Sequence, residues 1–408
     1  MIWSNKLYSM DIKNNIRRLA DFYFDEIVEI RRHLHQYPEL SFHEYETARY
    51  IEALLNRLGL SSERVTETGL TGTLRKVEPE ARTVALRADI DALPIFEKTG
   101  LEYSSKYEGK MHACGHDAHT AMLIGAIKIL KSLEDEYSGN VKFIFQPGEE
   151  KLPGGALKMI EAGVLENPRP DLIIGQHVYP DLTAGSLGFK PGPYMASTDE
   201  IYLTIKGQGG HGALPHQYDD TIYLATEIIQ VLQHVICRKS SPRIPTVLSF
   251  GKIIANGATN IIPDEVYIEG TFRTMDEKWR NKAHRLIREM ADSVVRPTTA
   301  KCELSIKRSY PVLVNDTETT EKAIQQSLQM WGKKSIESLN IRMTAEDFSY
   351  YTREIPGVFY RLGIRNKFKG INSPLHSSTF NIDENTLKTG MANLAWLAIS
   401  FLQDSDSS

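Results

Sequence analysis

Apolar residues recur with a helical period in two segments near the start of the chain, residues 12–34 and residues 45–58. The second segment ends at Gly59, a residue that commonly terminates helices. Short β-like apolar runs follow, with one more helical segment at residues 118–133 between them. The runs cover residues 83–90, 140–146 and 171–178. This alternation predicts an α/β domain in which helices cover a sheet.

The pattern changes at residues 191–193, where a Pro-Gly-Pro sequence interrupts both kinds of period. The elements expected beyond this break are strands at residues 200–207 and 265–274, and helices near residues 221–238, 277–295 and 384–402. All but the last of these predict an inserted α+β domain. We therefore expect a first domain built from residues 1–190 and 310–408, with residues 191–309 as the insertion.

The composition of the chain limits its class and its partners. It has 408 residues, 41% hydrophobic and 25% charged, which is enough for a sizeable core and two domains. The formal net charge of −4 is small and both signs are interspersed, which argues against nucleic acid and anionic membranes as partners. No apolar run reaches membrane-spanning length and no signal-peptide pattern is present, so a cytoplasmic protein is expected. Three widely separated cysteines argue against a disulfide scaffold.

The segment KMHACGHDAHTAMLIGA, residues 110–126, concentrates one cysteine and three histidines. One residue separates Cys114 from His116, so in an extended segment both face the same side, and a thiolate beside an imidazole suits a zinc-like ion. His119 shares a face with His116 if a helix has begun. Two other interpretations stay open from these residues alone: a polar helix start, and a cysteine nucleophile with its histidine base.

Three further segments place possible metal ligands at strand ends or in loops. FQPGEE puts Glu149 and Glu150 directly after a strand, so that one carboxylate could hold metal while the other moves protons. GQHV puts His177 at the end of the next strand, and SPLHSSTF puts His376 in a loop before the final helix. Open α/β sheets gather ligands at such positions, so the four segments together predict a metal site.

Nine motifs in order, from about residue 31 to the last helix, resemble those of the metal-dependent amidohydrolases grouped with aminoacylase, hippurate hydrolase and indoleacetyl-amino-acid hydrolase. They are RRHLHQYPELSFHEYET, LRADIDALPI, MHACGHDAHTAML, FQPGEE, GQHV, GQGGHGALPH, NIIPDEVYIEGTFRT, TAEDFSYY and LHSSTFNIDE. The resemblance implies an α/β fold: a mixed-sheet hydrolase domain with a dinuclear metal site, interrupted by an α+β lid domain through which relatives commonly dimerise.

The resemblance also implies roles for individual residues. Glu149 would be the general acid/base that takes a proton from water and passes it to the leaving amine. Asp91 would support the site without binding metal, because relatives with a metal-binding His-x-Asp pair have histidine where this chain has Asp89. The ligands of two divalent metal ions would be Cys114, His116, Glu150, His177 and His376. Zinc suits this ligand set first, with manganese, cobalt or nickel as alternatives.

In the inserted domain, the resemblance assigns substrate contacts to His211, Asn260 and Arg273. His211 would also act in catalysis by reaching the carbonyl oxygen in a partner subunit, although Gly212 stands where relatives usually have alanine. The guanidinium of Arg273 is well shaped for a free carboxylate. Without the surrounding motifs, these three residues would be interpreted as a turn histidine, a turn asparagine and a surface arginine.

Other conspicuous residues receive structural interpretations. The histidines of the first helix and its exit, expected to be solvated or packed, are His33, His35 and His43. His112 and His119 are expected near the site without binding metal. Glu346 and Asp347 are expected at a helix N-terminus, where acids interact favourably with the helix dipole.

The expected reaction is hydrolysis of the amide bond of a small-molecule N-acyl amino acid, with an acetyl, benzoyl or related acyl group. Its products would be a carboxylic acid and a free amino acid. The expected assembly is a homodimer or higher homo-oligomer formed through the lid. A dipeptidase or carboxypeptidase on the same metal site is the alternative enzyme. A binding protein on a degenerate hydrolase fold is disfavoured, because every expected ligand and the acid/base glutamate are present.

Overall fold

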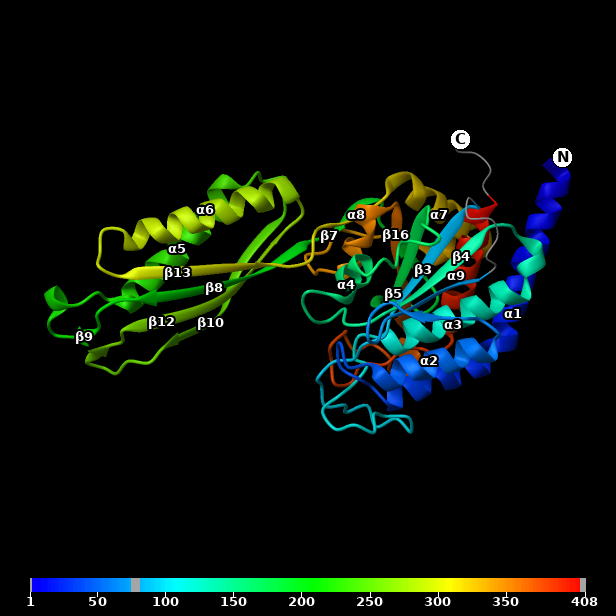
Figure 1. Cartoon of the computed structure of the whole chain (residues 1–408), viewed down its shortest axis with the longest axis horizontal. Helices are drawn as coiled ribbons and strands as arrows, with labels where there is room; N and C mark the ends of the chain where they lie inside the picture. The colour runs from blue at the N-terminus through cyan, green and yellow to red at the C-terminus, as the bar shows by residue number, and fades with distance from the viewer. Residues whose placement is uncertain (1, 75–80, 404–408) are drawn as a thin grey trace. The chain divides into compact units, whose positions relative to one another are not determined.

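The computed structural model describes residues 2–74 and 81–403, and the chain divides into two compact units (Figure 1). The first contains Met1–Gly192, Val314–Asn340 and Asp347–Ser408, and the second contains Pro193–Leu313 and Ile341–Glu346. Two short strands, β7 (Gly192–Met195) and β14 (Leu313–Asn315), lie where the chain passes from one unit to the other. The sequence placed the domain boundaries after residues 190 and 309, and these boundaries stay a prediction.

A mixed sheet of eight strands among the described residues forms the centre of the first unit, in the order β1-β2-β4-β3-β5-β16-β6-β15. Its strands are β1 (Glu63–Arg64), β2 (Leu70–Leu74), β3 (Thr83–Asp89), β4 (Asn140–Gln146), β5 (Leu172–Thr183), β6 (Leu187–Phe189), β15 (Ile336–Ser338) and β16 (Gly357–Arg365). The neighbours β4, β3, β5 and β16 run parallel. Strands β3 and β4 are buried throughout, which is typical of parallel strands covered on both faces.

Helices surround this sheet and complete the core of the first unit. They are α1 (Ile2–Gln36), α2 (Tyr45–Arg57), α3 (His116–Ser132), α4 (Gly155–Glu161), α7 (Thr317–Trp331), α8 (Tyr351–Glu354) and α9 (Thr386–Leu402). Helices α3 and α9 pack on β3 and on each other, and α1 packs on both helices. Of the helices in the described part of the chain, none is long and apolar enough to cross a membrane.

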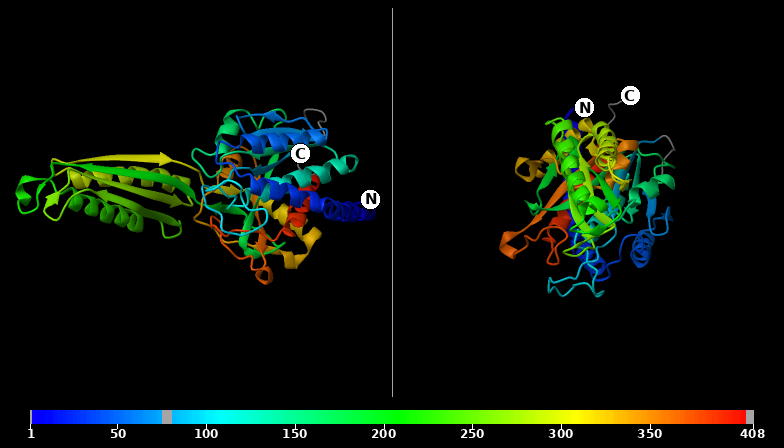
Figure 2. Two further views of the ribbon diagram at one scale, coloured as in Figure 1. Left: turned by 90° about the horizontal axis from the view of Figure 1, so that it is seen from below. Right: turned by 90° about the vertical axis from the view of Figure 1, so that its left-hand side faces the viewer.

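The second unit consists of a four-stranded antiparallel sheet, in the order β10-β12-β8-β13, with two helices on one face (Figures 1 and 2). Its elements are β8 (Ser197–Lys206), β9 (Gly210–His211), α5 (Thr221–Lys239), β10 (Thr246–Ala255), β11 (Ile261–Ile262), β12 (Glu265–Thr274), α6 (Glu277–Val295) and β13 (Lys301–Arg308). Alternate residues of β8, such as Ile201 and Leu203, are buried and join Ile228 of α5 and Ile287 of α6 in one core. The strand period of two thus gives the sheet one apolar and one polar face.

Most elements expected from the sequence are present, with differences at their ends. Strands β4 and β12 and helix α6 have the expected bounds. Helix α1 begins at Ile2 instead of residue 12, and β5 continues to Thr183, five residues beyond its expected end at 178. The extension of β5 has a tertiary cause, because β16 pairs with it as far as Arg365 and Thr183.

Candidate metal centre

The candidate ligands lie at one edge of the parallel part of the first unit's sheet. The register places Asp89 at the end of β3 opposite Gln146 at the end of β4. His177 of β5 lies two residues beyond the last pairing of β3 with β5, and therefore level with Asp89. The turn after β4 then carries Glu149 and Glu150. Carboxyl ends of parallel strands are the usual place for ligands in an open α/β sheet.

A glycine before α3 gives Cys114 and His116 their positions. Gly115 has a left-handed backbone conformation, with φ of +85°. A Cβ atom at Gly115 would lie 2.4 Å from Val178 Cγ2, so a larger residue would clash with β5 as well as strain the backbone. The side chains on either side of this bend, Cys114 and His116, are both buried.

Five side chains form two ligand groups that share Cys114. One group contains Cys114, His116 and His177, the other contains Cys114, Glu150 and His376, and within each group the ligand atoms lie within 4.8 Å of one another. Cys114 Sγ is 3.5 Å from His177 Nε2. His376 Nε2 is 3.1 Å from Glu150 Oε1. The structure thus brings together all five residues that the sequence suggested as ligands, and their donor atoms would suit divalent cations.

Hydrogen bonds orient the two buried imidazoles of this cluster. His177 Nδ1 donates to the backbone oxygen of Val178 at 2.7 Å, which leaves Nε2 to face Cys114. His116 Nδ1 lies 3.0 Å from Asp91 Oδ1. Its buried Nε2 has no hydrogen-bond partner among the described residues. Metal-binding histidines commonly have one nitrogen held in this way and the other left for the ion, so the donor set fits divalent cations.

The charges around Cys114 also favour a cation. Burial raises the pKa of the Cys114 thiol, and the neighbouring carboxylates of Glu150, Glu149 and Asp89 raise it further. Burial alone would lower the pKa of His116, but Asp89 and other nearby carboxylates outweigh burial and raise it to about 10. Several carboxylates compete for few positive charges here, a situation that a divalent cation relieves.

His119 lies beside the cluster, but both of its ring nitrogens are engaged. Its Nδ1 is 2.6 Å from Asp89 Oδ1. Its Nε2 accepts a hydrogen bond from the backbone N–H of Val178 at 2.9 Å. The ring therefore connects β3 with β5 and has no nitrogen left for an ion, in keeping with a supporting position.

His211 and Asn260 lie next to each other in the second unit, where β9 pairs with β11. The backbone N–H of Gly212 donates to the backbone oxygen of Asn260 at 2.9 Å. Both His211 and Asn260 are exposed. Because the N–H of Ala213 donates to His211 Nδ1 at 3.1 Å, the neutral ring carries its proton on Nε2. His211 can thus donate a hydrogen bond from Nε2.

Arg273 lies near the opposite end of β12 from these two residues. It pairs with Thr198, whereas Glu265 at the start of β12 pairs with Lys206, shortly before β9. Eight residues of strand separate these two positions, roughly 27 Å. Arg273 Nη1 donates to the backbone oxygen of Met343 at 3.1 Å, and burial lowers the pKa of the guanidinium. Within one chain, the structure does not bring Arg273 to His211.

The chain matches the model of peptidase family M20/M25/M40 over residues 85–399. It belongs to this family. The matched range covers all five residues of the two ligand groups. Membership in the M20/M25/M40 family makes the chain a metal-dependent hydrolase of amide bonds.

Relatives in this family include proteins with several described activities. The chain is 38% identical to thermostable carboxypeptidase 1 of Saccharolobus solfataricus, over 96% of the chain and 98% of that protein. It is 41% identical to an N-acyl-L-amino acid amidohydrolase of Geobacillus stearothermophilus, over 75% of the chain and 82% of that protein. The crystal structure of Bacillus subtilis YxeP, described as a dinuclear metal binding peptidase from the M20 family, matches with TM-score 0.79 and 33% identity, covering 94% of the chain and 99% of YxeP.

Sequence reasoning missed a buried ionic network next to α3. His35 Nδ1 and Arg31 Nε each lie 2.8 Å from Asp117 Oδ2, and His35 Nε2 lies 3.2 Å from Glu97 Oε1. His35 was expected to be solvated or packed, and it is buried between the carboxylates of Glu97 and of Asp117, the residue that follows the candidate ligand His116. The available signal was the i, i+4 spacing of Arg31 and His35 on the otherwise apolar side of α1.

Asp347 is the centre of another buried hydrogen-bond network that the sequence did not indicate. It begins the short 3₁₀-helix Asp347–Ser349, but its side chain is fully buried. The carboxylate accepts hydrogen bonds from Arg87 Nη2 at 3.0 Å, Gln146 Nε2 at 2.8 Å and the N–H of Ala156 at 3.0 Å. Asp347 therefore ties the ends of β3 and β4 to the segment after the Glu149 turn.

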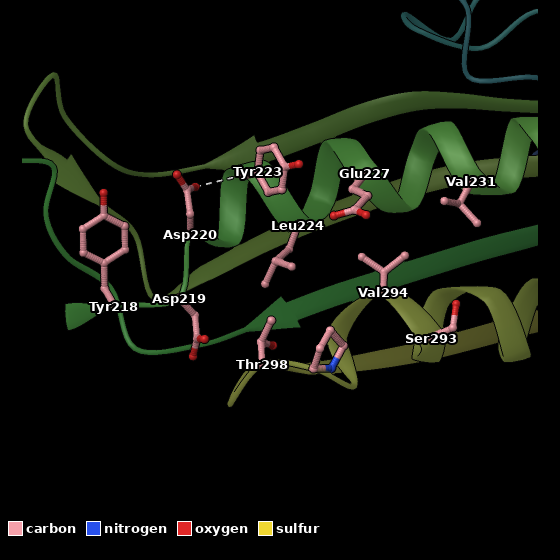
Figure 3. A pocket seen from close by; sticks show the side chains of 11 residues that line it. Tyr218, Asp219, Asp220, Tyr223, Leu224, Glu227, Val231, Ser293, Val294 and Thr298 are labelled. Carbon is pink, nitrogen blue, oxygen red and sulfur yellow. Dashed lines mark hydrogen bonds between the residues drawn. The ribbon is translucent and has the colours of Figure 1, made fainter. Parts of the chain in front are cut away.

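The second unit contains a cavity of about 420 Å³ between the start of α5 and the end of α6 (Figure 3). Two of its carboxylates already have structural partners. Asp220 caps α5 by accepting from the N–H of Tyr223 at 2.9 Å, and Asp219 accepts from Thr299. We therefore do not include this cavity in the candidate site.

Proposed function

We propose that the chain hydrolyses N-acyl amino acids and releases a carboxylic acid and a free amino acid. The observation that carries this proposal is the pair of ligand groups sharing Cys114, with the carboxylate of Glu149 beside them. The name of the Geobacillus relative, an N-acyl-L-amino acid amidohydrolase, supports the substrate class.

Cys114, His116, Glu150, His177 and His376 would hold two divalent cations. When bound, these ions would generate a nucleophile from water at neutral pH and stabilise the negative charge that develops on the carbonyl oxygen. A thiolate with three imidazoles and one carboxylate suits zinc first, and it also accepts manganese, cobalt or nickel.

Glu149 would transfer the protons. Its side chain is buried, with 7% exposed, and a carboxylate oxygen lies within 4.8 Å of ligand atoms of His116 and Glu150. Glu149 would accept a proton from the attacking water and then donate it to the nitrogen of the leaving amino acid. Such general acid/base catalysis typically contributes about 10²–10⁴ in rate.

The three residues of the second unit would bind substrate, and His211 would complete the site of a partner subunit. The Nε2–H of His211 would donate to the carbonyl oxygen as negative charge develops there. Asn260, beside His211, and the guanidinium of Arg273 would bind the substrate, with Arg273 directed to its carboxylate. A symmetric dimer formed through the second unit would present His211 of each chain to the other, because a two-fold axis places the same surface on both subunits.

A carboxypeptidase is the second candidate, and the 38% identical Saccharolobus relative with that name favours it. The two candidates differ in the substrate on the acyl side of the bond. An N-acyl amino acid carries no amine there, whereas a peptide carries an amino acid residue with its own amine or amide nitrogen.

The deciding experiment compares N-acetyl, N-benzoyl and indoleacetyl amino acids with dipeptides and N-blocked peptides of the same C-terminal residue. The enzyme is reconstituted separately with zinc, manganese, cobalt and nickel, and the released amino acid is measured. A kcat/KM at least about tenfold higher for simple acyl groups supports the proposal, and the reverse order supports the carboxypeptidase. Elemental analysis of the active form should give two metal ions per chain.

A further inference from the structure

A segment distant in sequence, residues 41–44, holds the turn that carries Glu149 and Glu150. Gly148, directly before Glu149, has φ of +58°. A Cβ atom on Gly148 would lie 2.3 Å from Cε1 of Phe42. The Phe42 ring therefore packs directly on the turn, and only glycine leaves room for it.

Glu44 joins the same two residues through one carboxylate oxygen. Its Oε1 accepts hydrogen bonds from the backbone N–H of Phe42 at 2.8 Å and from that of Gly148 at 2.9 Å. Its Oε2 accepts from Thr68 Oγ1 at 2.8 Å. The side chain is 0% exposed. Without this buried carboxylate, the N–H groups of Phe42 and Gly148 would lose their shared acceptor. The carboxylate therefore stabilises the position of the Gly148 turn relative to the Phe42 turn.

Phe42 has a backbone conformation that bulky residues rarely adopt, with φ of +66°. Such conformations persist only where the surrounding structure over-determines them, and they cluster at functional sites. Two contacts hold Phe42 here: the hydrogen bond from its N–H to Glu44, and Lys158, whose Nζ lies 3.7 Å from the ring centroid. The strained residue thus serves to keep an aromatic ring against Gly148.

Ser41 links the segment to the other half of the turn. Its Oγ donates to Asp91 Oδ2 at 2.7 Å, and the same oxygen accepts from the backbone N–H of Glu150 at 3.0 Å. Asp91 thereby supports the candidate metal ligand, whereas Glu44 holds the residue that precedes the acid/base. The two glutamates of the turn therefore have separate supports.

We propose that Glu44 is a positioning residue for Glu149, because it fixes the backbone from which the Glu149 carboxylate projects. The inference rests on the proposed proton-transfer role of Glu149. Glu44 acts through Gly148 and Phe42 and does not touch the substrate. A displacement of about 1 Å in a catalytic group can cost about 10² in rate, which sets the size of the expected effect.

Glu44→Ala removes both hydrogen bonds to the two turns and should lower kcat by about 10², with KM changed by less than about threefold. Glu44→Gln keeps an amide oxygen that can accept from both N–H groups, so it should retain most of kcat. Thr68→Val is the matched control, because it removes the hydrogen bond at Oε2 and leaves Oε1 in place. All variants are assayed with saturating metal and an amide that the unaltered enzyme hydrolyses.

Hydrogen–deuterium exchange of a peptide that contains Gly148 gives a readout independent of turnover. The Gly148 amide should lose protection in Glu44→Ala and keep it in Glu44→Gln. If Glu44→Ala does not fold, Glu44→Asp replaces it, since the shorter side chain keeps the charge but cannot reach both backbone N–H groups.

Lost kcat and lost protection, both restored in Glu44→Gln, support the positioning role. A folded Glu44→Ala or Glu44→Asp variant with unaltered kcat overturns it, even if the enzyme hydrolyses N-acyl amino acids. Retention of full activity by Glu149→Ala would instead overturn the proposed proton transfer, so the two failures are distinguishable.

Discussion

In the first unit, four of the five candidate metal ligands are buried or nearly so, and neighbouring groups fix the rings of His116 and His177. In the second unit, His211 is exposed on the two-residue strand β9, and Asn260 is exposed directly before the two-residue strand β11. Among the described residues, the His211 ring has one hydrogen-bond partner, the backbone N–H of Ala213 at Nδ1. The first group is preorganised by the fold of its own unit, whereas the second presents its side chains to solvent.

The difference separates two requirements of catalysis. Metal ligands and an acid/base need fixed geometry before substrate arrives, and burial with hydrogen bonds provides it. The proposed substrate-binding groups need a donor that faces the substrate, and the exposure of His211 and Asn260 provides it. Activity should therefore depend on the contacts that support the buried ligands of the first unit. The contribution of His211 and Asn260 should depend on the protein surface that they contact in a partner subunit.

The largest effect is expected for the two glutamates of the buried centre. Glu149→Ala should lose at least about 10²–10⁴ in kcat and retain two metal ions, because it removes the proposed proton transfer and no proposed ligand. Glu150→Ala should lose metal as well as activity. Elemental analysis after gel filtration, together with kcat, measures both effects, and equal metal loss in the two variants would contradict the division of roles.

In the second unit, His211→Ala should lose about 10²–10³ in kcat, the effect of removing one oxyanion donor. Its melting temperature should stay that of the unaltered protein, because the ring is exposed. Mixed refolding tests the placement of His211 in a partner subunit. A heterodimer of Glu149→Ala and His211→Ala contains one site with both residues intact, so part of the activity should return. Verified heterodimers as inactive as their parents would show that His211 acts within its own chain or not at all.

If Cys114 binds metal as proposed, metal removal should expose its thiolate. With metal bound, Cys114 should react with iodoacetamide at least about tenfold more slowly than after chelation, because a ligating thiolate is shielded. Mass spectrometry of the modified peptide measures the two rates, with the exposed Cys237 as internal reference. Equal rates with and without metal, accompanied by loss of activity in both, would favour a cysteine nucleophile.

The smallest effect concerns acid stability of the network beside the metal centre. Burial acts to raise the pKa of Glu97, but hydrogen bonds from His35, Thr99 and Ser105 outweigh it and lower the pKa from 4.5 to about 2. A lowered carboxyl pKa stabilises the folded state above the unfolded value, and this stabilisation is lost as the pH falls through the window from 4.5 to about 2. Glu97→Gln should therefore have a lower free energy of unfolding than the unaltered protein at pH 7, and this difference should narrow as the pH falls. Urea unfolding at several pH values measures the difference. For the control His211→Ala, the difference should be near zero at every pH.

Local patterns predicted the elements well where one segment contains the whole signal. Strand β4 and helix α6 have the expected bounds, because the short β-like run of β4 and the helical apolar period of α6 end where the elements end. The end of β5 was not predictable in this way, since pairing with β16, almost two hundred residues later in the chain, extends it. The identity of the candidate ligands came from motif resemblance, and periodicity alone left a capped helix or a cysteine nucleophile open.

The sequence by itself determined which residue types are available, where helices and strands form, and that an insertion separates two parts of one domain. Only the tertiary structure decided that Cys114 belongs to two ligand groups and that His119 has no free nitrogen. It also decided that Glu44 reaches Gly148, 104 residues away. The physical reason is that propensity and periodicity act between near neighbours in sequence, whereas ligand geometry and buried hydrogen bonds depend on distances that exist only after the sheet has closed its core.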